Sequence, residues 1–314
     1  YYSFFYIYTS RLMQYSVNTK INWDIMPVWG GVKEFVFPAR NTVSGPVENP
    51  EKINIVTGLR NCDIKALTGV LDKIFLQEQP EDTIYKSLRN NLRIVTVDCI
   101  NPAESCFCTS VGGQPYGSLD SDLNITVLGD IILLDIGTEE GKELLEKDNL
   151  QESMNYVNAD QEEEKKRKDL RDTAERKVNN NFTLDFKENG FQEKIVSNRL
   201  REYWSQKASK CMQCGGCNFC CPTCYCNVLN EVSNKSQIRK VIQWDSCQFP
   251  GYARVAGGAN QRPEMWERFR HRYSCKFTKM PLECGVPGCT GCGRCIQTCP
   301  AGIDIKETII GLYD

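Results

Sequence analysis

The sequence predicts an α+β protein, with an N-terminal α/β domain over residues 1–137, a charged helical linker over 138–200 and a cysteine-rich α-helical domain over 201–314. The length of 314 residues suggests two domains, at roughly 150 residues for each. Four cysteines lie in the first half, and the other fourteen fall between Cys211 and Cys299. A segment rich in Glu, Lys, Asn and Gln, 138–193, separates the two groups. We therefore place the domain boundary in this segment.

Apolar patterns predict the α/β architecture of the first part. The runs 53–57, 92–97 and 125–134 are expected to be strands. Asp63 is the expected N-cap of a helix over 63–75. Cys62 would then lie where a strand turns into a helix N-terminus, a place that favours a negative partner. The helix is predicted from apolar side chains at helical spacing, namely Ile64, Leu67, Leu71 and Ile74.

Charge pairs predict a solvated helix in the linker. Acidic residues precede basic ones by four positions, which is the favourable orientation on a helix surface. Such a pattern is typical of an exposed helix that bridges two domains. The pairs are Glu162 with Lys166, Glu163 with Arg167, and Glu164 with Lys168.

The overall charge and hydropathy exclude several classes of partner. With 38 basic and 40 acidic residues, the net charge is −2, which gives no global argument for nucleic acid or an anionic membrane. No run approaches the ~18 apolar residues of a spanning helix. The aromatic start, 1–8, lacks the basic region and cleavage site of a signal peptide. We expect a cytoplasmic chain with no membrane span and no nucleic-acid partner.

The cysteine and histidine counts indicate a metal bound by thiolates. The chain has 18 Cys and a single histidine, His271. Dense disulfides belong to small secreted domains, whereas clustered cytoplasmic thiols stay reduced and more often bind metal. One imidazole also excludes every site that needs two, including Cys₂His₂ zinc and Rieske iron.

The spacing C-x2-C-x2-C-x3-C-P occurs twice. The first motif comprises Cys211, Cys214, Cys217 and Cys221, and the second comprises Cys289, Cys292, Cys295 and Cys299. In [4Fe–4S] ferredoxins with this spacing, three thiolates hold one cluster and the fourth ligates the cluster of the other motif. A pair of zinc sites fits poorly, because zinc ribbons use two separated C-x2-C pairs. We therefore expect one cluster on Cys211, Cys214, Cys217 and Cys299, and its twin on Cys289, Cys292, Cys295 and Cys221.

The 67 residues between the motifs indicate a long helical connection of the kind found in α-helical ferredoxins. Five stretches together resemble one family: 221–226 (CPTCYC), 245–248 (DSCQ), 255–263 (VAGGANQRP), 268–273 (RFRHRY) and 291–295 (GCGRC). They are similar to the iron–sulfur β subunits of archaeal sulfhydrogenases, which are cytosolic NiFe hydrogenases, and to the related iron–sulfur subunits of anaerobic sulfite reductases. The stretches 58–63 and 98–108 continue the resemblance in the same order.

The resemblance implies a third cluster on the first-half cysteines, Cys62, Cys99, Cys106 and Cys108. Their spacing alone leaves open that they are buried, unligated thiols in an α/β core. The resemblance also implies electron relay between a flavin subunit that handles NAD(P)H and a catalytic subunit, either a NiFe hydrogenase or a reductase. We expect three [4Fe–4S] clusters. No flavin or nucleotide is expected on this chain, because its glycine pairs lack a dinucleotide-binding context.

Six cysteines remain, and they form two groups. Cys220 and Cys284 fit no pattern and are expected to bind no metal. The other four match positions of the family pattern, and three interpretations stay open: a fourth cluster, a structural zinc, or inert packed thiols. These four are Cys224, Cys226, Cys247 and Cys275.

A basic stretch, 251–280, accompanies these cysteines. We interpret Arg268, Arg270 and Arg272 as charges that offset negative clusters and raise their potentials, and His271 as a polar contact rather than a ligand. The expected function is electron relay, without catalysis by this chain alone. Two alternatives stay open: a self-contained iron–sulfur reductase that uses Cys224, Cys226 and Cys247, and a zinc-stabilised interaction module.

Overall fold

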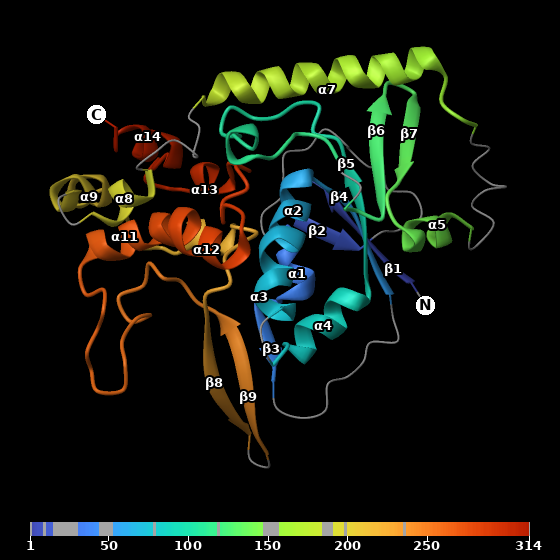
Figure 1. Ribbon diagram of the computed structural model, residues 1–314. Helices are drawn as coiled ribbons and strands as arrows, with labels where there is room; N and C mark the ends of the chain where they lie inside the picture. Colours follow the sequence, from blue (N-terminus) through green and yellow to red (C-terminus); the bar gives the residue numbers. More distant parts are fainter. Residues whose placement is uncertain are drawn as a thin grey trace.

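The computed structural model describes residues 2–8, 11–14, 31–43, 53–77, 80–117, 120–146, 157–183, 191–197, 200–234 and 237–313. A six-stranded sheet in the order β2-β1-β4-β5-β6-β7 forms the first half (Figure 1). Strands β1, β4, β5 and β6 run parallel, and β2 and β7 add antiparallel edges. The strands are β1 (Tyr2–Tyr8), β2 (Arg11–Gln14), β4 (Ile53–Leu59), β5 (Leu92–Val97), β6 (Leu123–Leu128) and β7 (Ile131–Ile136). The carboxyl ends of parallel strands lie at the same edge of a sheet. The segments that follow the neighbouring strands β4 and β5 therefore begin side by side.

Two of the three predicted strands are present, as β4 and β5. The single strand predicted over 125–134 is wrong, because the chain turns at Gly129 and forms the antiparallel pair β6 and β7. Gly129 has a φ of +66°, a left-handed conformation that glycine adopts without steric cost. The apolar run continues past this turn into the edge strand.

A helix follows β4, as predicted, but it begins before Asp63. It starts as α2 (Asn61–Ala66), continues through a π-helical turn (Leu67–Leu71) and ends as α3 (Asp72–Leu76). Arg60 is the N-cap residue, and the Asp63 carboxylate accepts the Arg60 backbone N–H at 3.2 Å. Two further short helices pack with this helix against the sheet, namely α1 (Lys33–Val36) and α4 (Thr83–Asn90). The buried core beneath them includes Val56, Leu59, Ile64, Leu67 and Leu71.

The linker contains the predicted helix, which runs from the β6–β7 hairpin towards the second half (Figure 1). This helix, α7 (Gln161–Asn181), is 21 residues long and follows the shorter α5 (Glu139–Glu146). The predicted pair of Glu162 and Lys166 forms at 2.7 Å. Arg167 instead bonds Asp135 of β7 at 2.6 Å. The helix is therefore tied to the sheet as well as solvated.

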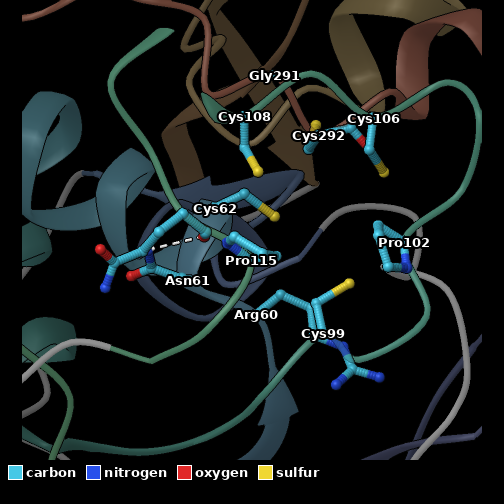
Figure 2. Close-up of a pocket in the computed structure, with 11 residues that line it drawn as sticks. Arg60, Asn61, Cys62, Cys99, Pro102, Cys106, Cys108, Pro115, Gly291 and Cys292 are labelled. Carbon is cyan, nitrogen blue, oxygen red and sulfur yellow. Dashed lines mark hydrogen bonds between the residues drawn. The ribbon is translucent and has the colours of Figure 1, made fainter. Parts of the chain in front are cut away.

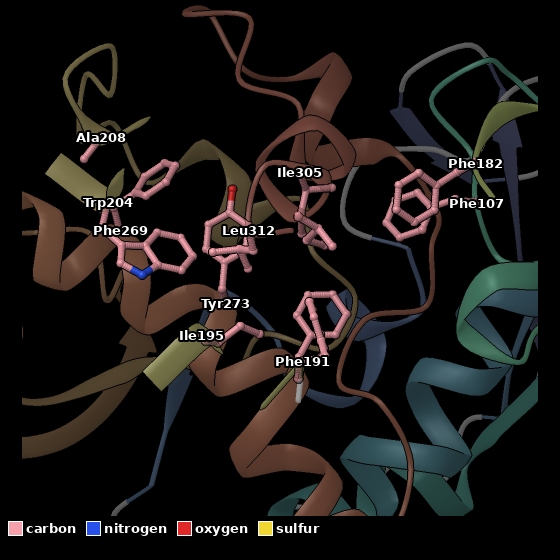
Figure 3. Close-up of a cluster of buried hydrophobic side chains, with 12 residues drawn as sticks. Phe107, Phe182, Phe191, Ile195, Trp204, Ala208, Phe269, Tyr273, Ile305 and Leu312 are labelled. Carbon is pink, nitrogen blue, oxygen red and sulfur yellow. The ribbon is translucent and has the colours of Figure 1, made fainter. Parts of the chain in front are cut away.

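Helices of the second half pack around an aromatic core (Figure 3). They are α8 (Phe191–Val196), α9 (Arg201–Ala208), α11 (Met265–Ser274) and α14 (Ile305–Ile310). The helix α12 (Met280–Cys284) packs instead against Val70 of the first half. A π-helical turn (Cys275–Lys279) joins α11 to α12. Trp204 lies 5.2 Å from the Tyr273 ring. Phe107 of the first half and Phe182 after α7 belong to the same cluster, so the two halves share a core.

The connection between the cysteine motifs is not wholly helical, which corrects the prediction. It begins with the hairpin β8 (Asn227–Asn234) and β9 (Gln237–Trp244), and β9 also pairs with β3 (Arg40–Thr42). Val228, Val241 and Ile242 are β-branched and favour strands. The mixture of helix and strand agrees with the predicted α+β class. Within the described residues, no helix is both long and apolar enough to cross a membrane.

Candidate metal centres

The two cysteine motifs fold into matching loops. Each leads into a short helix, α10 (Gly216–Phe219) or α13 (Arg294–Gln297), whose N-cap is a left-handed glycine. Gly215 and Gly293 have φ values of +74° and +72°, and two residues earlier Gln213 and Gly291 have values of +55° and +65°. The repeated spacing therefore produces a repeated backbone path.

The second motif and Cys221 line one hollow, which we call the central hollow. It has about 340 Å³ of free space, part of it open to solvent. Arg272 and Lys276 form another part of its wall. Cys221 belongs to the first motif, so the chain brings ligands of both motifs to one place. The four thiols are those of Cys221, Cys289, Cys292 and Cys295.

Of the other three cysteines of the first motif, Cys211 interacts with Cys299. Burial, and the neighbouring thiols of Cys299 and Cys214, raise the pKa of Cys211. Burial also raises the pKa of Cys217, which interacts with Cys211, to about 11. The backbone N–H of Gln213 donates to the Cys211 sulfur at 3.4 Å. A donor of this kind stabilises a negatively charged sulfur.

Figure 2 shows the four first-half cysteines around a second hollow, which we call the N-terminal hollow. It has about 320 Å³ of free space, part of it open to solvent. Gly291 and Cys292 of the second motif lie on its wall, and Cys292 also lines the central hollow. The two hollows are therefore neighbours. The first-half thiols are those of Cys62, Cys99, Cys106 and Cys108.

Two strand ends and one loop bring these cysteines together. Cys62 lies in the first turn of α2 after β4, and Cys99 follows the end of β5. The other two come from the loop beyond, where the Phe107 N–H donates to the Gly291 carbonyl at 2.8 Å. The Phe107 ring is buried in the aromatic core of the second half. The loop is thus anchored on the domain that carries the second motif.

Charged side chains hold the walls of the N-terminal hollow. Asp63 is 1% exposed and accepts two hydrogen bonds from Arg294, at 2.7 and 2.9 Å. The Arg60 guanidinium donates to the Asp98 carbonyl at 2.7 Å. The Asp98 carboxylate pairs with Arg171 of α7 at 2.7 Å. These contacts link the strand ends to α7 and to the second motif.

The remaining family-pattern cysteines line a third hollow, which we call the hairpin hollow. It has about 710 Å³ of free space, part of it open to solvent. Cys226 directly precedes β8 and Cys247 follows β9, so both lie beyond the open end of the hairpin, where Asn227 pairs with Trp244. The Asp245 N–H donates to the Cys226 carbonyl at 2.9 Å. The four thiols are those of Cys224, Cys226, Cys247 and Cys275.

The donor sets of these hollows fit iron–sulfur clusters. Four thiolates are the usual ligands of a [4Fe–4S] cluster. Burial raises the pKa of Cys106 and of Cys108 to about 12, so binding of a cluster there would release protons. Among the described residues, no three His, Cys, Asp or Glu side chains are arranged to hold a single metal ion.

Two buried cations separate the central hollow from the hairpin hollow. Arg272 and Lys276 are 8% and 1% exposed and line both. Burial alone would lower the pKa of Lys276, but the Cys221, Cys224 and Cys275 thiols raise it above its ordinary value. Within the described part of the chain, the Arg272 Nε has no hydrogen-bond partner. A buried cation is costly unless it is compensated, so these two favour a negative occupant.

Of the three arginines predicted to tune clusters, Arg272 is the one that faces a hollow. Arg268 is buried, but its guanidinium donates to the Gln213 side chain at 2.7 Å and to nearby carbonyls. Arg270 lies 5.0 Å from the Trp266 ring. Residues two positions apart on a helix point in nearly opposite directions, so the structure does not place Arg270 beside a thiol.

His271 and the two cysteines predicted not to bind metal have separate surroundings. His271 lines the hairpin hollow, and burial together with Arg262, Lys279 and Arg270 lowers its pKa to about 4, so the ring is neutral near pH 7. Cys220 and Cys284 are both buried, and neither lines any of the three hollows.

Motif spacing did not identify four further polar side chains near the thiols, namely Lys33, Asn218, Lys276 and Arg294. Asn218 and Arg294 lie between cysteines of the two motifs, so their positions in the sequence could have identified them. Lys33 comes from the first half, yet its ammonium donates to the Phe219 carbonyl at 3.1 Å and lies 3.9 Å from the Trp244 ring. Lys276 lies in the basic stretch 251–280, whereas nothing local in the sequence marks Lys33, because its burial depends on the tertiary fold.

Comparisons with known proteins agree with this chemistry. A family model described as a 4Fe-4S dicluster domain matches residues 210–303, which include both motifs. The sulfhydrogenase 2 β subunit of Pyrococcus furiosus is 34% identical over 253 residues, which cover 80% of this chain and 71% of that protein. No solved structure matches the chain.

Proposed function

The chain belongs to the sulfhydrogenase β-subunit family, and on this premise we propose its place in an oxidoreductase complex. It is an iron–sulfur electron-transfer subunit. In this proposal it relays single electrons between a flavin subunit that handles NAD(P)H and a catalytic subunit of the hydrogenase or sulfite-reductase type. The chain itself forms and breaks no bond in the substrate.

The central hollow would hold the cluster of the second motif. Its ligands would be Cys289, Cys292, Cys295 and the crossing Cys221, which line one space. The reciprocal cluster would use Cys211, Cys214, Cys217 and Cys299. Cys214 is exposed, so the reciprocal cluster would lie close to the surface, where a partner can approach.

The N-terminal hollow would hold a third cluster. Its four thiols surround a common space (Figure 2), although Cys62 follows β4 and the other three follow β5. Asp63 and Arg294 hold the two sides of the hollow together through a buried pair. We therefore assign Cys62, Cys99, Cys106 and Cys108 as its ligands.

The observation that carries the relay is that the hollows share walls. Cys292 lines both the N-terminal and the central hollow. Cys217 of the first motif interacts with Cys295 of the second. Clusters at these sites would form an unbroken series, as one-electron transfer requires. The chain's own residues orient the thiolates and supply compensating charge through Arg272 and Lys276.

The test uses the purified complex with a Cys295→Ser variant of this chain. We expect NAD(P)H-linked turnover to fall at least tenfold, because the electrons lose their route through the central hollow. Turnover driven by a reduced viologen dye should be retained, because the dye can reduce the catalytic subunit directly. Cys284→Ser is the matched control, since Cys284 is a buried thiol outside the three hollows.

Unchanged NAD(P)H-linked turnover in the Cys295→Ser complex would contradict the relay. Equal loss of both activities would indicate that the variant disrupts the assembly instead of the route. Substrate turnover by the isolated wild-type chain with the same dye would contradict the proposal that catalysis lies in another subunit.

A further inference from the structure

The hairpin hollow, which the proposed relay does not use, has buried amide groups that donate hydrogen bonds to its cysteine sulfurs. Asn218 is 2% exposed, and its side-chain amide donates to the sulfurs of Cys224, at 3.5 Å, and Cys247, at 3.3 Å. Gln248 is 3% exposed and donates to the Cys247 sulfur at 3.4 Å. N–H groups that point at sulfur stabilise thiolate ligands and tune the metal that they bind.

Both amides are held in place by further hydrogen bonds. The Asn218 side-chain oxygen, Oδ1, accepts a hydrogen bond from the Ser246 hydroxyl at 3.0 Å. The Gln248 amide also donates to the Arg268 carbonyl at 2.9 Å, and the Arg268 guanidinium returns a bond to the Gln248 carbonyl at 3.2 Å. Arg268 therefore acts on this hollow through Gln248. Four buried polar side chains are thus hydrogen-bonded around the thiols, namely Asn218, Ser246, Gln248 and Arg268. Inert thiols packed in a core would not require such a polar network.

The charge around the hollow also favours a negative occupant. Arg272, Lys276 and Lys279 line it, against one carboxylate, Glu283. Lys276 is almost fully buried, and within the described residues its ammonium bonds the Thr223 hydroxyl and contacts the Met280 sulfur. Four thiolates around a cluster leave a net negative site, which these cations would offset.

The geometry favours a cluster over a single zinc ion. Zinc requires all four sulfurs about 2.3 Å from one point. The four thiols line one hollow, but among the described residues no three Cys, His, Asp or Glu side chains are arranged to hold a single ion. The site also adjoins the central hollow, because Arg272 and Lys276 line both.

We propose that the hairpin hollow holds a fourth [4Fe–4S] cluster, ligated by Cys224, Cys226, Cys247 and Cys275. It exchanges one electron with the cluster of the central hollow, so that one is oxidised as the other is reduced, and no substrate bond changes. The neighbouring cluster is part of the proposed function, whereas the site itself is defined by residues that the relay leaves unused.

Metal analysis of the anaerobically purified full chain tests the proposal. Four clusters predict about sixteen iron and sixteen acid-labile sulfide per chain, and no stoichiometric zinc. Cys226→Ser should lose about four of each, because serine keeps the size of cysteine but ligates iron less well. Cys284→Ser, the matched buried control, should keep about sixteen of each. The wild-type count decides the question even if the Cys226→Ser chain does not fold.

Two results overturn the proposal. One zinc per wild-type chain that Cys226→Ser removes would make the site structural zinc. If the iron and sulfide counts per chain are the same in Cys226→Ser as in the wild type, these four residues are packed thiols that bind no cluster. A parallel Cys106→Ser chain separates this site from the N-terminal hollow: about twelve iron in the wild type, about eight in Cys226→Ser and about twelve in Cys106→Ser would support the fourth cluster and remove the third.

Discussion

Arg294 and Asp63 are 231 residues apart in sequence and form a buried ion pair at 2.7 Å. Their side chains are 3% and 1% exposed. Arg294 belongs to the second cysteine motif, and Asp63 follows Cys62 in the first turn of α2. This contact connects the C-terminal cysteine loop to the N-terminal sheet at the place where two thiol-lined hollows meet.

Asp63→Asn should destabilise the protein by about 3–5 kcal/mol, because it leaves the Arg294 charge buried without its partner. Glu81→Gln is the control. The Glu81–Lys86 pair has a similar distance, 2.6 Å, but is 36% and 49% exposed, so its loss should cost less than about 1 kcal/mol. Anaerobic thermal unfolding of the holoprotein measures both. Equal shifts in the two midpoints would show that the buried pair has no special role.

Gly291→Ala should damage the N-terminal hollow. A Cβ at Gly291 would lie 2.5 Å from the Cys108 backbone, and its φ is +65°. We expect the 105–108 loop to be displaced and about four iron to be lost. Gly302→Ala is closely matched, since Gly302 has a φ of +63° but no atom within 4 Å of its Cβ position. Iron loss of the same size in both variants would attribute the effect to backbone strain rather than to the contact with Cys108.

Cys221→Ser should damage the cluster of the second motif, because Cys221 lines the central hollow with Cys289, Cys292 and Cys295. Cys299→Ser is the reciprocal variant and should damage the cluster of the first motif. Cluster-resolved electron paramagnetic resonance, or a structure of each variant, measures the outcome. If each substitution harms the cluster of its own motif instead, the crossed assignment is wrong.

Arg272→Gln should lower the reduction potential of the cluster in the central hollow. A unit charge roughly 6 Å away, at an effective dielectric constant of about 20, contributes about 3 kcal/mol, which is on the order of 100 mV for one electron. Arg270→Gln removes a charge from the same helix on the side of Trp266, so it should shift the potential much less. A redox titration followed by spectroscopy compares the two. Equal shifts would refute a specific role for Arg272.

The cysteine motifs could be predicted from the sequence because their information is local. Three thiolates at fixed spacing, with glycine where a left-handed turn is needed, define a loop whatever surrounds it. The same holds for β4, β5 and α7, whose periodicity or charge pattern lies within a single segment. The turn at Gly129 was missed although Gly129 and Asp130 are typical residues of a hairpin turn. The β8–β9 hairpin was missed because polar residues interrupt its Val and Ile residues, and the segment was expected to be helical.

The sequence by itself determined that this protein carries thiolate-bound iron–sulfur chemistry and which family it belongs to, and the comparisons confirm the family. Spacing and resemblance predicted the groups of cysteines, but only the tertiary structure decided that three of these groups line hollows with shared walls. It brings Cys62 and Cys99 from two strand ends to the second motif, and Cys226 and Cys247 together across a hairpin. It also decided that Lys276 is buried beside thiols while Arg270 is not. The physical reason is that burial and charge compensation depend on which distant segments pack together, and no spacing within one segment encodes that.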